Sequence, residues 1–195
     1  MQSSTYERLY RIAEAQAGYF TTAQAGAVGI DRNRLTRYTA AGQLERVRHG
    51  IYRLASFPRA PHEDLFVAWL TTGPDSVISH DSALAIYELS DALPARIHVT
   101  VPRTASRRRS GVRLHTGRIA PDETTRYGAL RMTTVARTIA DVAFDSLADD
   151  LVIQAVQEAV SRGLASAEEL LDAAKRRGTA VTGLIQRILD GVARS

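Results

Sequence analysis

Apolar residues at the start of the chain recur three and four positions apart, which predicts two helices in succession. The first helix is expected to begin at Ser4, where Glu7 completes a capping box. The second is expected to begin at Thr21, with Gln24 in the matching position. Gly29 suits a left-handed turn, so the second helix should end there.

A third helix and two short strands follow. Asp31 is the expected N-cap of this helix and Gly42 its stop, with Leu35 on the inward face. Residues 44–47 and 51–54 are short extended runs joined by a tight connection. Two helices, an arginine-bearing third helix and a two-stranded wing predict a winged helix-turn-helix.

The pattern changes after residue 55. Residues 56–61 hold two prolines and no periodicity, which predicts a linker. Beyond it the expected helices lie near 62–71, 134–144, 147–162, 167–176 and 180–190. Residues 76–89 are expected to form a short extended entry followed by a helix, and further extended segments are expected at 97–101, 112–116 and 123–132. The prediction is an α+β chain: a winged helix-turn-helix domain over 1–57, then a C-terminal domain over 58–195 with a small antiparallel sheet and several helices.

Charge falls into blocks along the chain. The net charge is +4 overall, but residues 1–59 carry +5, residues 60–95 carry −6 and residues 96–137 carry +8. Two basic blocks separated by an acidic one indicate two different tasks.

Composition excludes several classes of protein. The absence of cysteine excludes disulfides, thiol catalysis and the usual zinc fingers. The N-terminus lacks the pattern of a signal peptide, and no apolar run reaches the roughly 20 residues of a membrane span. We therefore expect a cytoplasmic protein without a membrane partner.

The first basic block favours binding to double-stranded DNA. Residues 31–53 carry six arginines and two acids, and an arginine in the major groove can donate two hydrogen bonds to guanine. Asn33, Arg34 and Arg37 are expected at base edges, with Arg32 and Thr36 nearer phosphates and Thr21 and Thr22 at the DNA backbone. The wing residues Arg46, Arg48 and His49 are expected to reach the minor groove or its phosphates. The predicted DNA-binding residues are Thr21, Thr22, Arg32, Asn33, Arg34, Thr36, Arg37, Arg46, Arg48 and His49. The alternative is a small helical domain with a solvated basic face.

The second basic block lies between two predicted strands. Its members are Arg103, Arg107, Arg108, Arg109 and Arg113. One interpretation is a solvated hairpin loop. The other is an anionic contact, made either with the DNA backbone or with an acidic surface of a partner such as a toxin.

Other clusters of polar residues have simpler interpretations than catalysis. His80, Asp81 and Ser82 are adjacent, whereas the members of a hydrolytic triad come from separate elements. His98 and His115 are expected as partly exposed neighbours across the sheet, a poor zinc site without a third ligand. The aspartates between 141 and 150 are expected around a helix start rather than at a metal. No catalytic residue, metal site or cofactor is predicted.

Two sets of motifs resemble a known family, the AbiEi-type antitoxins of bacterial type IV toxin–antitoxin systems. In the N-terminal part they are Thr21-Thr22, Gly29-Ile30, Gly42-x-Leu44 and Gly50-Ile51-Tyr52. In the C-terminal part they are Ile78-Ser79-His80-x-Ser82-Ala83-Leu84, the strand 97–102, Val112-x-x-His115 and Met132-Thr133-x-x-x-Arg137-Thr138-x-x-Asp141.

The resemblance implies a non-enzymatic antitoxin. Such a protein binds repeats in its own promoter through the winged helix and represses the operon. Its C-terminal domain counters a nucleotidyltransferase-like toxin, either by direct binding or by acting on the toxin's modification or target. The alternative is a plain winged-helix transcription regulator whose second domain senses a ligand or forms a dimer. The sequence assigns no operator and no oligomeric state, and the Arg103-to-Arg113 region is the expected toxin-facing surface.

Overall fold

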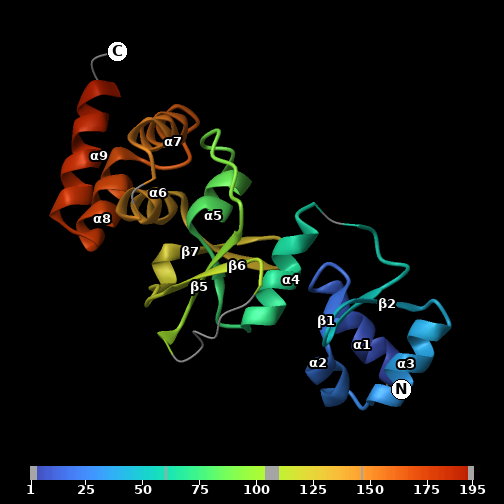
Figure 1. The fold of residues 1–195 in the computed structure, drawn as a ribbon. Helices are drawn as coiled ribbons and strands as arrows, with labels where there is room; N and C mark the ends of the chain where they lie inside the picture. The colour runs from blue at the N-terminus through green and yellow to red at the C-terminus, as the bar shows by residue number, and fades with distance from the viewer. Residues whose placement is uncertain (1–3, 60, 104–109, 146, 193–195) are drawn as a thin grey trace. The chain divides into compact units, whose positions relative to one another are not determined.

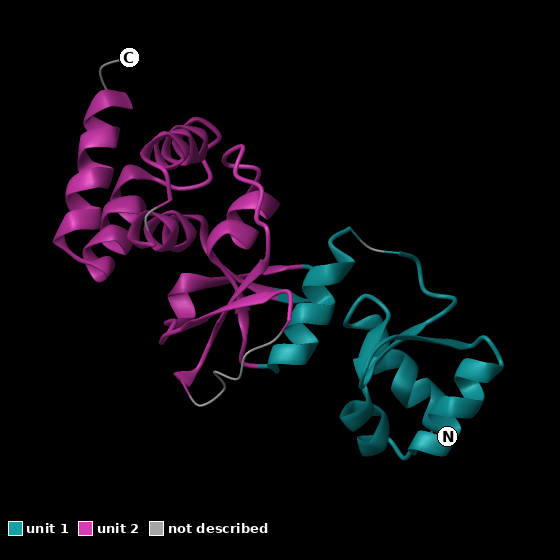
Figure 2. Ribbon diagram, viewed as in Figure 1, with its two compact units in different colours: residues 1–74, 128–130 teal, residues 75–127, 131–195 magenta. Residues whose placement is uncertain are grey.

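The computed structural model describes residues 4–59, 61–103, 110–145 and 147–192. The chain divides into two compact units, residues 1–74 with 128–130 and residues 75–127 with 131–195 (Figure 2). Within the described ranges, no helix has the length and apolar character needed to cross a membrane.

Three helices of the first unit begin where the sequence places their caps. They are α1 (Thr5–Glu14), α2 (Thr22–Ala27) and α3 (Arg32–Ala40) (Figure 1). Ser4 and Thr21 each form a capping box, and the side chain of Asp31 accepts from the backbone of the first turn of α3. Leu9, Ile30 and Leu35 are fully buried in the core that these helices share.

The sheet of the first unit has three strands rather than the two predicted. They are β1 (Tyr19–Thr21), β2 (Leu44–Arg48) and β3 (Ile51–Leu54), in the order β1-β3-β2, and both pairings are antiparallel. The prediction missed β1 because three residues before a helix cap give almost no periodicity. Burial of the Phe20 ring against the helices is the physical reason for this extra strand.

A fourth helix, α4 (Glu63–Thr72), is grouped with the first unit. It lies against β1 and β3, where the ring of Phe66 stacks on that of Tyr19 at 6.0 Å. The sequence instead assigned this helix to the second domain. The boundary at residue 57 stays a prediction.

The second unit contains a five-stranded sheet. Its strands are β4 (Val77–Ile78), β5 (Ile97–Val101), β6 (Val112–Thr116), β7 (Thr124–Tyr127) and β8 (Leu130–Thr133), in the order β6-β5-β4-β8-β7. A 3₁₀ turn, η2 (Pro121–Glu123), precedes β7.

This sheet is mixed, so the predicted antiparallel arrangement was wrong for it. The pair β4–β5 is antiparallel, whereas β5–β6 and β4–β8 are parallel. The connection between β5 and β6 explains the error. Its ten residues, 102–111, can span about 33 Å, enough to return the chain along a five-residue strand of about 17 Å.

Helices form the larger core of the second unit. They are α5 (His80–Tyr87), α6 (Val135–Phe144), α7 (Asp149–Ser161), α8 (Ala167–Arg177) and α9 (Thr179–Val192) (Figure 1). Among them α5 packs on β5 of the sheet. Ile139 of α6, Val156 of α7 and Ile185 of α9 are all fully buried in one cluster. The α+β class predicted from the sequence is confirmed.

Candidate DNA-binding face and the polar sites of the second unit

The exposed face of α3 carries polar and cationic side chains. Leu35 is fully buried, and helical spacing places Asn33 and Arg37 on the opposite side of α3. Both are exposed, and so are Arg32 in the first turn and Thr36. Within the described part of the chain, Arg32 and Arg37 have no ion-pair partner and are available to an anionic ligand.

The side chain of Arg34, in contrast, is hydrogen-bonded within the first unit. Its Nη1 atom donates to the carbonyl oxygen of Gly29 at 3.1 Å, and its Nη2 atom donates to the hydroxyl of Tyr38 at 3.2 Å. The guanidinium also lies 5.9 Å from the centre of the Tyr38 ring. Arg34 therefore holds the turn between α2 and α3 together, a role that the prediction of a base contact did not include.

The wing formed by β2 and β3 carries three exposed cationic or titratable side chains, Arg46, Arg48 and His49. The pairing with β3 shifts register between Arg46 and Arg48, which marks a bulge. Arg46 Nη2 lies 3.2 Å from Nδ1 of His49, so these two side chains form one polar group at the end of the wing.

Thr21 and Thr22 are used within the first unit. The hydroxyl of Thr21 accepts from the backbone of Gln24 as the cap of α2. The amide and hydroxyl of Thr22 donate to the carbonyl oxygen of Gly50 at 2.9 Å and 3.3 Å. These bonds fix the wing tip to the N-terminus of α2, so the two threonines position the predicted DNA-binding face.

Arg53 contributes to the basic composition of this segment but not to its surface. Its side chain is 2 % exposed and pairs with Glu45 at 3.5 Å and Glu63 at 4.0 Å. It also donates to the backbone carbonyl of Phe57. Arg53 joins β3 to α4, and counting arginines alone could not separate it from the exposed ones.

The predicted second basic cluster is only partly described. Arg103 and Arg113 are exposed, while Arg107, Arg108 and Arg109 lie outside the described residues. Arg113 Nη2 lies 3.4 Å from Oδ2 of Asp145. Arg103 instead lines a cavity of about 480 Å³ with Arg118 and Arg131. Arg103, Arg118 and Arg131 have no ion-pair partner in the described ranges. The cavity that they line is therefore a candidate site for an anionic group.

Three histidines meet inside the second unit. His80 begins α5, His98 lies on β5 and His115 on β6. The rings of His80 and His115 stack at 3.5 Å, and the His98 ring centre lies 5.1 Å from that of His115. His98 and His115 are thus neighbours across the sheet, as expected. The predicted partial exposure of His98 was wrong, because α5 covers the second face of β5 and leaves this side chain 6 % exposed.

Burial keeps these imidazoles neutral. Burial, together with the neighbouring His115 and His98, lowers the pKa of His80 to about 2. Burial lowers the pKa of His115 to about 4, although Asp145 acts in the opposite direction. Among the described side chains, His98 Nδ1 and His115 Nε2 are buried without a hydrogen-bond partner.

Asp141 occupies the centre of an ionic network beside the histidines, and its Oδ2 atom lies 4.0 Å from Nδ1 of His80. It is fully buried and accepts from Arg137 Nε at 2.7 Å and from Arg177. Arg137 also pairs with Glu123 at 2.6 Å. The network joins α6, α8 and η2. Arg137 and Asp141, the charged residues of the Met132-to-Asp141 motif, therefore stabilise the fold.

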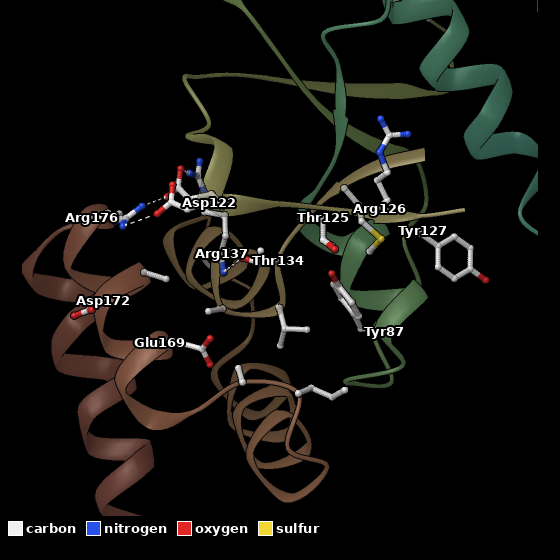
Figure 3. A pocket seen from close by; sticks show the side chains of 17 residues that line it. Tyr87, Asp122, Thr125, Arg126, Tyr127, Thr134, Arg137, Glu169, Asp172 and Arg176 are labelled. Carbon is white, nitrogen blue, oxygen red and sulfur yellow. Dashed lines mark hydrogen bonds and ion pairs between the residues drawn. The ribbon is translucent and has the colours of Figure 1, made fainter. Parts of the chain in front are cut away.

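A groove of about 590 Å³ opens next to this network (Figure 3). Figure 3 shows Arg176 directed at Asp122, and the two atoms that pair lie 2.9 Å apart. Arg176 also pairs with Glu123, and Glu169 accepts from the backbone of Ser166. The charges of the groove are therefore largely satisfied internally.

Comparison with known proteins relates the N-terminal part to one family. Residues 7–55 match the family model described as "Transcriptional regulator, AbiEi antitoxin". The match spans the segment from α1 to β3, so the resemblance inferred from the sequence is confirmed for this part of the chain. A search of curated proteins finds no match.

One solved structure shares the fold along the whole chain. It is the RV2827C protein from Mycobacterium tuberculosis, with a TM-score of 0.58 and 15 % identity, over 100 % of this chain and 80 % of that one. At this identity the likeness concerns the fold alone.

Proposed function

We propose that this chain, whose residues 7–55 match the AbiEi antitoxin regulators, is a DNA-binding antitoxin that represses its own operon and neutralises a toxin. The supporting observation is that the matched segment contains the exposed face of α3, where Arg32 and Arg37 have no ion-pair partner among the described residues. A cytoplasmic protein without enzymatic activity fits this function.

On DNA, α3 would enter the major groove. Arg37 and Asn33 would read base edges, because arginine and asparagine form two hydrogen bonds with guanine and adenine respectively. Arg32 and Thr36 would contact phosphates, and Arg46, Arg48 and His49 of the wing would contact the adjacent backbone or minor groove. Arg34, Thr21 and Thr22 would position this face.

The second unit would carry the antitoxic activity toward a nucleotidyltransferase-like toxin. The arginine-lined cavity with Arg103, Arg118 and Arg131 supports a contact with an acidic or phosphorylated surface. Direct binding of the toxin and action on its modification or target are both compatible with this cavity.

A second candidate is a plain transcription regulator with no toxin. It is favoured by the extent of the family match, which ends at residue 55 and leaves the second unit outside it. A neighbouring gene for a nucleotidyltransferase-like protein would support the antitoxin, and an isolated gene would support the plain regulator.

The experiment uses two cellular readouts. A reporter fused to the DNA upstream of the gene measures repression, and co-expression with the candidate toxin measures rescue of growth. We expect both repression and rescue from the wild-type chain. Arg37→Ala should lose repression and keep rescue, and a chain that rescues no growth would reduce the function to transcription regulation.

A further inference from the structure

We propose that His80, His115 and Asp145 bind one divalent transition-metal ion of the zinc type in the second unit. Their donor atoms, two imidazole nitrogens and one carboxylate oxygen, all lie within 4.8 Å of one another. Zn²⁺ prefers this combination of ligands, and sites with three protein ligands keep a fourth position for water. The inference is independent of the proposed DNA binding.

The distances between the donor atoms fit a shared ion. Tetrahedral ligands about 2.0 Å from Zn²⁺ stand about 3.3 Å apart. Asp145 Oδ2 lies 3.3 Å from His115 Nδ1 and 3.9 Å from His80 Nε2. The three side chains come from α5, β6 and the end of α6, so one ion would join three elements that are distant in sequence.

Buried nitrogens without a hydrogen-bond partner lie next to the proposed site. Among the described residues they include His98 Nδ1 and His115 Nε2, whereas the His115 nitrogen that faces Asp145 is Nδ1. His98 Nε2 lies 3.6 Å from Asp81 Oδ2. His98 and Asp81 thus form a second polar layer beside the three ligands, as outer-shell groups do around metal sites.

Two features of the metal-free arrangement must change when the ion binds. The rings of His80 and His115 are stacked within 11° of parallel, and a shared ion must lie in the plane of each ring. One ring therefore has to turn out of the stack. Arg113, 3.4 Å from Asp145 Oδ2 and half exposed, competes with the ion and has to move toward solvent.

The test is titration of chelator-treated, untagged full-length protein with Zn²⁺ by calorimetry, and with Co²⁺ by visible absorption. We expect one ion per chain and the absorption bands of a four-coordinate Co²⁺. His115→Ala and Asp145→Asn should each weaken binding by more than about 100-fold, since loss of an outer-shell partner alone costs roughly 10- to 100-fold.

The control is the double variant His49→Ala/His62→Ala, which removes the two histidines of the first unit and should bind as the wild type does. Arg113→Gln should bind at least as tightly, because it removes the competing cation. The proposal is overturned if no stoichiometric binding occurs, or if the double variant loses binding while His115→Ala retains it.

X-ray absorption at the zinc edge of the wild-type protein provides a measurement that needs no variant. Two imidazoles with oxygen in the remaining positions would support the site even if His115→Ala failed to fold. A coordination shell of oxygen alone would overturn it.

Discussion

The Nη1 atom of Arg34 donates to the carbonyl oxygen of Gly29 at 3.1 Å, so this arginine closes the turn that precedes its own helix. Gly29 adopts a φ of 88°, which ends α2 and directs the chain into α3. Arg37, one turn further along α3, is exposed. Two arginines of one short helix thus have different tasks, and substitution can separate them.

Arg34→Ala and Arg37→Ala are predicted to act on different properties. Arg34→Ala should lower the free energy of unfolding of the first unit by about 1 kcal/mol, since it removes hydrogen bonds from a half-buried turn. Arg37→Ala should leave stability within about 0.5 kcal/mol and weaken DNA binding by about 1–3 kcal/mol. Urea denaturation and binding titrations of both variants measure the two effects. Equal loss of stability in both would contradict the assignment.

Alanine substitutions at Gly18 and Gly42 compare a crowded glycine with an open one. Both have positive φ values, 90° and 70°, so alanine is strained at either position. A Cβ atom at Gly18 would lie 2.8 Å from Phe57, whereas one at Gly42 would have no other described residue, its chain neighbours aside, within 4 Å. Gly42→Ala should cost about 1 kcal/mol and Gly18→Ala clearly more. Thermal unfolding of the two variants decides this, and equal melting temperatures would argue against the tight packing of Phe57.

The buried network around Asp141 should contribute strongly to stability. Asp141→Asn removes the carboxylate charge that faces Arg137 and Arg177, and an unpaired buried charge costs about 3 kcal/mol. Asp172→Asn makes the same chemical change at an exposed pair with Lys175 and should cost less than about 0.5 kcal/mol. Urea unfolding curves compare them. A small effect of Asp141→Asn would mean that the network is dispensable.

Alkaline pH should destabilise the fold through two tyrosines. Burial raises the pKa of Tyr87 to about 12, and burial together with Glu63 raises that of Tyr19 to about 12. Unfolded tyrosine loses its proton near 10, so the unfolded state binds fewer protons between pH 10 and 12. Stability is therefore unaffected below pH 10 and falls above it, by at most about 1.4 kcal/mol per pH unit for each tyrosine.

Spectrophotometric titration of the phenolates tests this prediction. Two of the seven tyrosines should ionise late, and Tyr87→Phe should remove one of them. A wild-type protein in which all tyrosines titrate together near pH 10 would contradict it.

Local sequence signals predicted the helices of this protein well. Capping boxes at Ser4 and Thr21 fixed two helix starts, because each cap is satisfied by a residue three positions away. Strand direction was harder, because β5 and β6 are neighbours with a parallel orientation that depends on the path between them. No local pattern encodes that path.

The candidate site residues also divide into those that local sequence patterns predict and those that depend on contacts within the folded chain. The exposed residues of α3 could be predicted from helical spacing around Leu35. The internal role of Arg53 could not, because its partners Glu45 and Glu63 lie in other elements. The partners of Arg34, Gly29 and Tyr38, are close in sequence, but helical spacing alone does not show that this side chain bonds to them. The contact between His80 and His115 could not be predicted from the sequence either. The two residues are 35 positions apart, and the packing of α5 on the sheet brings them together.

The central claim is that the exposed face of α3 reads a sequence in DNA. The most direct measurement is a fluorescence-anisotropy titration of the purified protein onto DNA from upstream of its gene and onto a shuffled duplex, at several salt concentrations. The account predicts binding to the native site about 10³-fold or more tighter than to the shuffled duplex at physiological salt, with a large part of that ratio lost in Arg37→Ala. Equal and steeply salt-dependent binding to both duplexes would contradict it and would reduce the face to a general attraction for phosphate.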